Sequence, residues 1–217
     1  MDTHEIQGLA EPLPPGERVL WQGAPRWTAL AIHAFHVRKL VLYFSLILAL
    51  RALGVLADGG TAAEALTAAL WLTPLALAAL ALVTLIAWLT ARTTIYAITN
   101  RRVVMRVGVV LAITLNLPYR LIEAAGLRAY ADGTADLPLQ LQAGEHLAWL
   151  HLWPHVRPWR TAHPEPMLRS VPEPQQVATI LARALAEHAG IAARPAIETA
   201  GGVPPRVAVG RLAASHH

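Results

Sequence analysis

Two long apolar segments dominate the hydrophobic pattern in the first half of the chain. Residues 65–91 carry no charged side chain, and residues 40–57 carry one, Arg51. At about 1.5 Å per residue, the longer segment makes a helix of about 40 Å, which exceeds the ~30 Å hydrocarbon core of a bilayer. The pattern therefore predicts a transmembrane hairpin over residues 37–91, with spans at about 40–57 and 65–90.

Basic residues flank this hairpin on both outer sides, whereas the loop between the spans, residues 58–64, contains none. Positively charged flanks tend to stay on the cytoplasmic side of a membrane. The distribution predicts a multi-pass protein of the cytoplasmic (intracytoplasmic) membrane with both termini in the cytoplasm. Two roles fit Arg51 near the end of the first span. Its side chain snorkels to the interface, or it faces a partner helix or a lipid phosphate.

Beyond residue 92 the period of the pattern shortens to that of strands. Short alternating segments bounded by turn residues predict antiparallel strands, at 93–99, 103–107, 112–117 and 137–141. Residues 103–119 are apolar overall, but Arg106 and Gly108 interrupt them, so this segment is too short for a third span. Residues 121–130 fit a strand or a short helix equally well.

An amphipathic helix is predicted near the end of the chain. Apolar residues recur at helical spacing over about 175–189, and Gly190 is a natural helix stop. Residues 191–217 are rich in Ala, Pro and Gly without periodicity, which predicts a flexible tail. Strands followed by one helix indicate an α+β arrangement in which the helix caps the end of an antiparallel sheet or barrel.

The composition narrows the chemistry that this chain can perform. Of its 217 residues 15% are charged, the formal net charge is +4 and there is no cysteine. Disulfides, thiolate metal sites and cysteine nucleophiles are thereby excluded. The small basic excess fits a membrane surface better than nucleic acid, because the basic residues are spread along the chain and no recognition motif accompanies them.

Histidines are the remaining candidates for metal or pigment binding. Four of them fall within eighteen positions, but their spacing matches no standard zinc pattern: His146, His151, His155 and His163. We expect these to be polar residues on strands and loops near a membrane surface. Neither apolar segment contains a histidine, so pigment held inside the hairpin is not expected, although His33 and His36 lie just before it. No catalytic residue, metal site or cofactor is predicted.

Two groups of side chains are candidates for contact with a partner or with lipid headgroups. Arginines follow the second span at Arg92, Arg101, Arg102 and Arg106, and they hold anionic headgroups or act only as topology determinants. Tryptophans and arginines also alternate in a proline-rich stretch, at Trp149, Trp153, Arg157, Trp159 and Arg160. These form an exposed interaction patch, or the tryptophans fill the domain core with the arginines at its rim.

Two motifs resemble a known family. The segment Gly16-Glu17-Arg18-Val19-Leu20-Trp21-Gln22-Gly23 resembles the opening of bacterial membrane-flanked PH-like domains, and Tyr96-Ala97-Ile98-Thr99-Asn100-Arg101-Arg102 resembles their signature strand–turn–strand. In that family a two-helix hairpin commonly lies between these pieces, as it does here. The segment Leu152-Trp153-Pro154-His155-Val156-Arg157-Pro158-Trp159 further resembles the photosynthetic-complex assembly proteins of purple phototrophic bacteria.

This resemblance carries implications for fold and function. It implies a PH-like antiparallel β-barrel or sheet with a C-terminal capping helix, split in sequence by a transmembrane hairpin. Residues 1–36 then supply the first part of the domain and residues 92–190 the rest. It implies a non-catalytic assembly factor whose partners are reaction-centre or core-antenna subunits, other assembly factors and membrane lipid. The alanine-rich hairpin is also compatible with a homodimer, and a general membrane scaffold or anionic-lipid-binding module is the alternative function.

Overall fold

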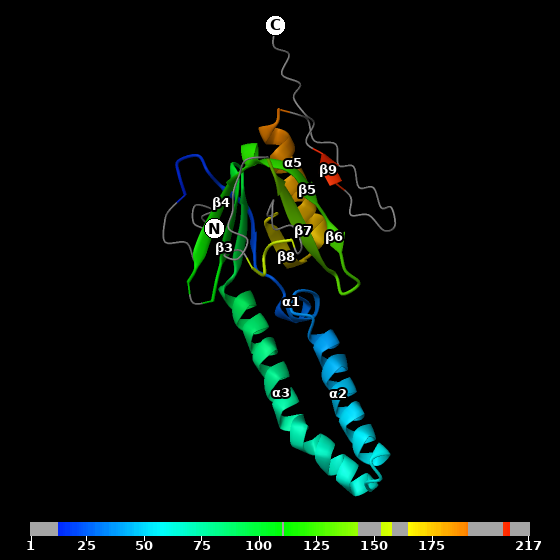
Figure 1. Cartoon of the computed structure of the whole chain (residues 1–217). Helices are drawn as coiled ribbons and strands as arrows, with labels where there is room; N and C mark the ends of the chain where they lie inside the picture. Colours follow the sequence, from blue (N-terminus) through cyan, green and yellow to red (C-terminus); the bar gives the residue numbers. More distant parts are fainter. Residues whose placement is uncertain (1–12, 110, 143–152, 158–164, 191–205, 209–217) are drawn as a thin grey trace. The chain divides into compact units, whose positions relative to one another are not determined.

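The computed structural model describes residues 13–109, 111–142, 153–157 and 165–190, and the backbone of residues 206–208. The chain divides into two compact units. A helical unit comprises Trp27–Leu89, and a sheet unit comprises Met1–Arg26 together with Thr90–His217. The helical unit thus begins ten residues before the hairpin boundary that the sequence predicts. The sheet unit is assembled from two separate parts of the chain (Figure 1).

The helical unit consists of a short helix and two long ones. Helix α1 (Trp27–His33) is followed by α2 (Val37–Ala57) and α3 (Ala62–Thr93), and the last turn of α3 belongs to the sheet unit. His36 adopts a left-handed conformation (φ 55°) at the start of α2, so the chain turns sharply there. Helix α1 is not predicted from the sequence, because its seven residues are too few for a helical period to show.

The start of α3 is fixed by a capping box. The backbone N–H of Thr61 donates to Glu64 Oε2 at 2.8 Å, and the N–H of Glu64 donates to Thr61 Oγ1 at 3.3 Å. A short turn precedes it, and α2 and α3 diverge from this turn (Figure 1). Both helices are long and apolar enough to cross a membrane. None of the residues of α2 is buried within the protein.

The first sheet of the sheet unit has four antiparallel strands in the order β1-β2-β3-β4. They are β1 (Val19–Gly23), β2 (Ile95–Thr99), β3 (Arg102–Val107) and β4 (Ile113–Pro118). Strand β1 comes from the part of the chain before the helical unit and pairs with β2 directly after it. The apolar stretch 103–119 forms β3 and β4 rather than a membrane span.

The second sheet joins strands from the rest of the domain. A 3₁₀ turn η1 (Tyr119–Leu121) leads to β5 (Ile122–Gly126), β6 (Arg128–Ala129) and β7 (Thr134–Leu141), followed later by β8 (Met167–Pro172). Strand β7 pairs with β5, β6 and β8. A short strand β9 (Arg206–Ala208) pairs with the other edge of β5. This strand lies within the segment for which the sequence predicts only a tail, and β8 is also unpredicted.

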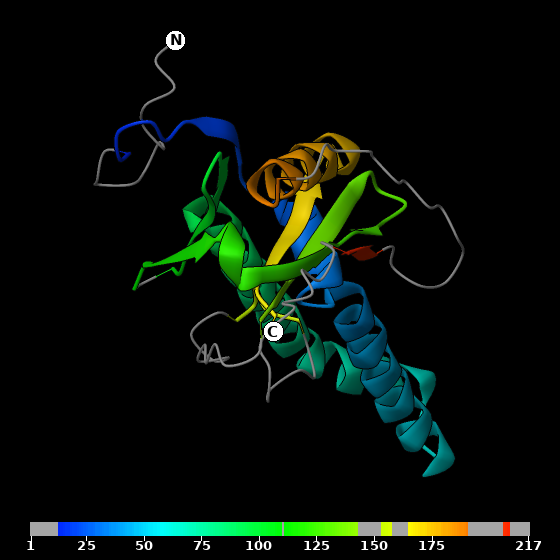
Figure 2. The ribbon, with the colours of Figure 1, turned by 90° about the horizontal axis from the view of Figure 1, so that it is seen from above.

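Helix α5 (Pro174–His188) packs on both sheets. The helix lies against the sheets (Figure 2) and contacts β1, β2, η1 and β7. Its buried residues include Val177, Leu181 and Leu185. The core lies between the sheets and this helix, and its buried residues come from β2, β3, β4, η1, β5, β7, β8 and α5. The sequence predicted strands from the alternation of apolar residues, and it predicted α5 from their helical spacing. An antiparallel α+β domain is therefore observed, with two sheets rather than one continuous barrel.

Candidate functional site

The arginines that follow the second long helix do not form one group. Arg92 lies in the last turn of α3, and Arg106 pairs with Ile95, two residues beyond the end of that helix. We call the end of the first sheet that contains Thr94, Ile95 and Arg106 the helix-exit end. Arg92 and Arg106 both belong to it.

Arg101 and Arg102 lie at the opposite end of the same sheet, in and after the β2–β3 turn. Strand β2 rises about 13 Å between Ile95 and Thr99, at about 3.3 Å per residue. Arg101 and Arg102 therefore lie apart from Arg92 and Arg106, and contact of these arginines with lipid headgroups stays a prediction. The strand–turn–strand geometry separates residues that are close in sequence.

Arg102 instead forms an ion pair with Glu17. Its Nε donates to Glu17 Oε1 at 2.8 Å, and the carboxylate is nearly fully buried. The hydroxyl of Thr99 donates to the same oxygen at 2.8 Å, while Thr99 Oγ1 accepts from the backbone N–H of Arg102 at 3.0 Å. A buried carboxylate needs such partners, because an unpaired buried charge is costly.

Asn100 completes this arrangement through its side chain. Its Oδ1 accepts from the N–H of Arg18 at 2.9 Å, and its Nδ2 donates to the carbonyl of Gly16 at 3.0 Å. Gly16 has a φ of +76°, which favours glycine. We call the set Gly16, Glu17, Thr99, Asn100 and Arg102 the N-terminal clasp. Both motifs that carry the family resemblance meet in it, so the role that the geometry gives them is to hold β1 against β2.

A second polar group lies at the helix-exit end and is centred on His155. The side chain of His155 is completely buried within the sheet unit, which its proline-rich sequence context did not predict. Tyr96 Oη lies 2.6 Å from His155 Nδ1, and Thr94 Oγ1 lies 3.1 Å from His155 Nε2. Tyr96 Oη also accepts from the backbone N–H of Arg169 at 3.1 Å.

The neighbours of the ring fix its tautomer. Thr94 Oγ1 donates to the carbonyl of Thr90 at 2.7 Å, so it has only a lone pair left for His155. His155 Nε2 therefore carries the proton, and Nδ1 accepts from Tyr96. Burial, and then the positive charge of Arg169, lower the pKa of His155 to about 3. Burial raises the pKa of Tyr96, so both rings are neutral at physiological pH.

Strand β8 places two more polar side chains beside this group. Arg169 and Ser170 are buried, and within the described part of the chain Arg169 Nε and Ser170 Oγ have no hydrogen-bond partner. They occupy a bulge opposite Asp136, where Ser170 has a φ of +50° and its N–H donates to Asp136 Oδ1 at 2.9 Å. Tyr130 Oη donates to Asp136 Oδ2 at 2.7 Å. The carboxylate of Asp136 thus stabilises the irregular backbone of β8.

The tryptophan–arginine stretch is described only in part. The side chain of Trp153 is 51% exposed, so it does not fill the core. Arg157 Nη1 forms an ion pair with Glu165 Oε2 at 2.8 Å. Trp149, Trp159 and Arg160 lie outside the described residues, as do His146, His151 and His163.

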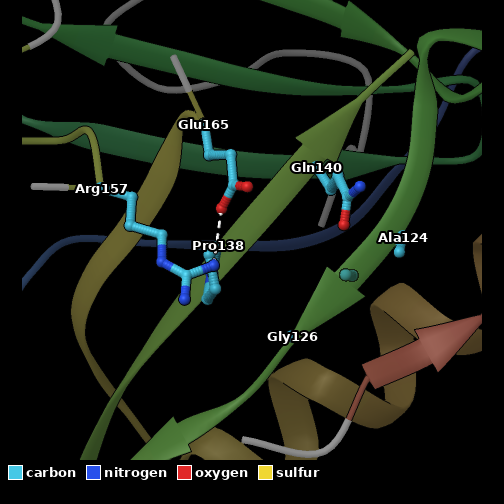
Figure 3. A pocket seen from close by; sticks show the side chains of 7 residues that line it. Ala124, Gly126, Pro138, Gln140, Arg157 and Glu165 are labelled. Atoms are coloured by element: carbon cyan, nitrogen blue, oxygen red, sulfur yellow. Dashed lines mark hydrogen bonds and ion pairs between the residues drawn. The ribbon is translucent and has the colours of Figure 1, made fainter. Parts of the chain in front are cut away.

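A small pocket adjoins the Arg157–Glu165 pair (Figure 3). The rest of its lining comes from β5 and β7, with Gln140 and the smaller residues Ala124, Ala125, Gly126 and Pro138. The charges of Arg157 and Glu165 neutralise each other, so this pair gives the pocket no net charge with which to attract a charged ligand. Arg51 is exposed on α2.

Comparisons with known proteins decide the family. The profile of the bacterial PH domain matches residues 42–185, about two thirds of the chain. The chain belongs to the bacterial PH domain family. A relative from Rhodobacter capsulatus is described as an uncharacterized 23.7 kDa protein in the puhA 5' region. It is 35% identical over 184 residues, which are 84% of this chain and 86% of the relative. Together these matches agree with a PuhB-like family within the bacterial PH domains. No solved structure matches the chain.

Among the described residues of this bacterial PH domain, two hydrogen-bonded polar groups lie at opposite ends of the first sheet. The N-terminal clasp lies at one end of the first sheet, and the His155 group lies at the helix-exit end. The two family motifs contain the residues of the clasp, but the sequence did not predict the hydrogen bonds and the ion pair between them. Nothing in the sequence singled out Thr94 or Arg169. In the described residues no group of three or more potential metal-ligating side chains comes together.

Proposed function

We propose that this bacterial PH domain protein is a non-catalytic assembly factor for the photosynthetic reaction centre and its core light-harvesting complex. The observation that carries the proposal is the relative from Rhodobacter capsulatus, which covers most of this chain and is placed beside puhA. That position associates the relative with photosynthesis genes. The resemblance of the segment Trp153 to Trp159 to assembly proteins of purple phototrophs supports the same function.

The exposed surface of the helical unit supports a role in the membrane. Large apolar side chains are exposed along both α2 and α3, for example Leu42, Trp71 and Leu75. A soluble protein rarely exposes contiguous apolar surface of this extent. Lipid and the transmembrane helices of partner subunits are the environments that would cover it.

Alanines on α3 allow partner helices to pack closely against it. Small residues at helix surfaces let backbones pack tightly in membranes, where there is no hydrophobic driving force between helices. Residues of this kind recur along α3, at Ala65, Ala68, Ala69, Ala76, Ala78, Ala79 and Ala81. In the proposed mechanism, α2 and α3 dock on the helices of reaction-centre or antenna subunits while the sheet unit holds a cytoplasmic segment of a subunit or another assembly factor.

Deleting the gene in a phototrophic bacterium that carries it tests this function. We expect the amount of reaction centre per membrane to fall while the transcripts of its subunits stay unchanged, because assembly acts after transcription. Absorbance spectra of membranes and quantitative transcript measurements give the two readouts, and the gene supplied on a plasmid is the control.

Normal reaction-centre levels in the deletion strain would contradict the proposal. That result would favour the alternative, a general membrane scaffold or anionic-lipid-binding module. The separation of Arg101 and Arg102 from Arg92 and Arg106 weakens the form of this alternative in which all four arginines bind one lipid surface.

A further inference from the structure

The turn between β3 and β4 is built from apolar residues that are exposed. Leu111 is 81% exposed, and Val109 and Ile113 are 41% and 37% exposed. Turns are normally made of Gly, Pro, Asn, Asp and Ser. Here only Gly108 is of that kind; its φ of +120° and the nearby Leu111 carbonyl leave no space for a Cβ. We call Val109, Leu111 and Ile113 the hairpin tip.

Strand register places the hairpin tip at the helix-exit end of the sheet. Ile95 follows the last residue of α3 by two positions and pairs with Arg106. The next residue, Val107, pairs with Ile113, where β4 begins. The β3–β4 turn therefore lies at the end of the sheet where β2 begins (Figure 1). This placement follows from pairing within the sheet unit alone.

The remaining large apolar side chain that is exposed in the described part of the sheet unit lies at the same end. It is Trp153, two residues before His155, whose Nε2 is hydrogen-bonded to Thr94 at the start of β2. The four exposed large apolar residues are thus all close in structure to the end of α3. A random scatter of surface hydrophobics would not concentrate in this way.

We propose that the hairpin tip and Trp153 enter the interface of the bilayer that α3 crosses, so that the sheet unit is held on the lipid surface at its helix-exit end. This inference rests on the proposed membrane crossing. Apolar side chains gain by burial at the boundary between headgroups and acyl chains, and tryptophan concentrates there. Arg92 and Arg106 lie at the same end and supply positive charge for anionic headgroups.

This placement also explains why the stretch 103–119 is so apolar without spanning a membrane. One face of β3 and β4 packs in the core, while their turn contacts lipid. Arg101 and Arg102 take no part, because they lie at the other end of the sheet.

The absence of native cysteine makes a direct test simple. The full-length variant Leu111→Cys is labelled with an environment-sensitive fluorophore and reconstituted in nanodiscs of phosphatidylcholine and phosphatidylglycerol. Val109→Cys is a second reporter, and Glu187→Cys is the matched control. Glu187 is exposed near the C-terminal end of α5, next to His188, whose ring contacts Tyr119 at the far end of the sheet.

We expect nitroxide-bearing phospholipid to quench the labels at the tip several-fold more than the label at residue 187, and iodide in the water to do the reverse. Tip labels that are quenched by iodide as strongly as the control would overturn the inference. Labels shielded from both quenchers would also overturn it, since protein would then cover the tip. Extraction of the chain from native membranes by an alkaline wash would contradict the proposed membrane crossing itself, whereas the quenching results bear on the tip.

Discussion

At the scale of single residues, His155 links three parts of the sheet unit through its two ring nitrogens. The imidazole joins Tyr96 of β2 and, through it, the backbone of β8, while its other nitrogen bonds to Thr94, the residue between α3 and β2. Its hydrogen bonds require the neutral ring. Protonation would place a positive charge in a buried site beside that of Arg169, with Tyr96 no longer able to donate to Nδ1.

We expect the stability of the protein to fall as the pH is lowered from about 6.5. The unfolded chain takes up a proton on this histidine near pH 6.5, whereas the folded protein does so only near pH 3. The contribution of the neutral ring is therefore complete above pH 6.5 and is lost progressively toward pH 3. At about pH 5 the loss from this group is about 2 kcal/mol. Urea unfolding of the detergent-solubilised protein at several pH values measures it.

The variant His155→Gln separates this group from the carboxylates that titrate at lower pH. It is expected to be less stable than the unchanged chain at neutral pH, with a weaker dependence on pH between about 5 and 7. His188→Gln is the matched control, because it removes an exposed imidazole and leaves the buried hydrogen bonds intact. Equal pH dependence in His155→Gln and the unchanged chain would show that the buried ring does not govern this window.

The role of His155 could not be predicted from its neighbours in sequence. Its segment is rich in prolines and aromatics, which is typical of a surface loop. The residue is buried because residues 155–157 run beside residues 165–167, with the N–H of Met167 donating to the carbonyl of His155 at 2.9 Å. Such pairing of two irregular segments leaves no periodic signal. Arg169 and Ser170 escaped prediction for the same reason, since a bulge breaks the alternation of β8.

At the scale of secondary-structure elements, the N-terminal clasp decides whether β1 stays in the first sheet. Strand β1 is an edge strand of five residues, and its residues are only partly buried. The clasp adds hydrogen bonds from Asn100 and an ion pair between Glu17 and Arg102. These interactions add to the pairing of β1 with β2 and to the contact of β1 with α5.

The variant Glu17→Gln is expected to lower the free energy of unfolding by about 1–3 kcal/mol, because Arg102 loses a charged partner. Arg102 is partly exposed, so water compensates for part of the loss. Hydrogen exchange should rise chiefly in β1, at Val19–Gly23. Glu123→Gln is the control, since Glu123 is an exposed carboxylate on β5. Unchanged exchange in β1 would contradict the role of the clasp.

Much of the element layout followed from periodicity, and the exceptions have physical causes. The strands at Ile95–Thr99 and Arg102–Val107 were predicted, to within two residues at their ends, from short apolar segments bounded by turn residues, and the helix at Pro174–His188 was predicted from helical spacing. Helix α1 and strand β9 are shorter than the window in which a period can be recognised. The division into two sheets depends on which strand edges meet, and local sequence does not specify this.

At the scale of the whole chain, the helical unit is an insertion between the first strand of the sheet unit and the remainder. The sheet unit can close only because β1 and the clasp bring residues before position 26 back to β2, some seventy residues later in sequence. The fold therefore brings both boundaries of the helical unit to the same domain. If α2 and α3 each cross the bilayer, the turn between them must lie on the side opposite the sheet unit.

The distribution of charge predicts on which side of the membrane the turn between α2 and α3 lies, and labelling can measure this. Arg38, Lys39 and Arg92 lie at the outer ends of α2 and α3, whereas Asp58 and Glu64 lie at the turn between them. The positive-inside rule predicts from this distribution that the turn lies outside the cytoplasm. In intact cells whose outer membrane has been made permeable, a membrane-impermeant maleimide should label Asp58→Cys but not Glu187→Cys. In inverted membrane vesicles the pattern should reverse. Labelling of both residues from the same side would show that α3 does not cross the bilayer, because a crossing between residues 58 and 187 is needed to place them on opposite sides.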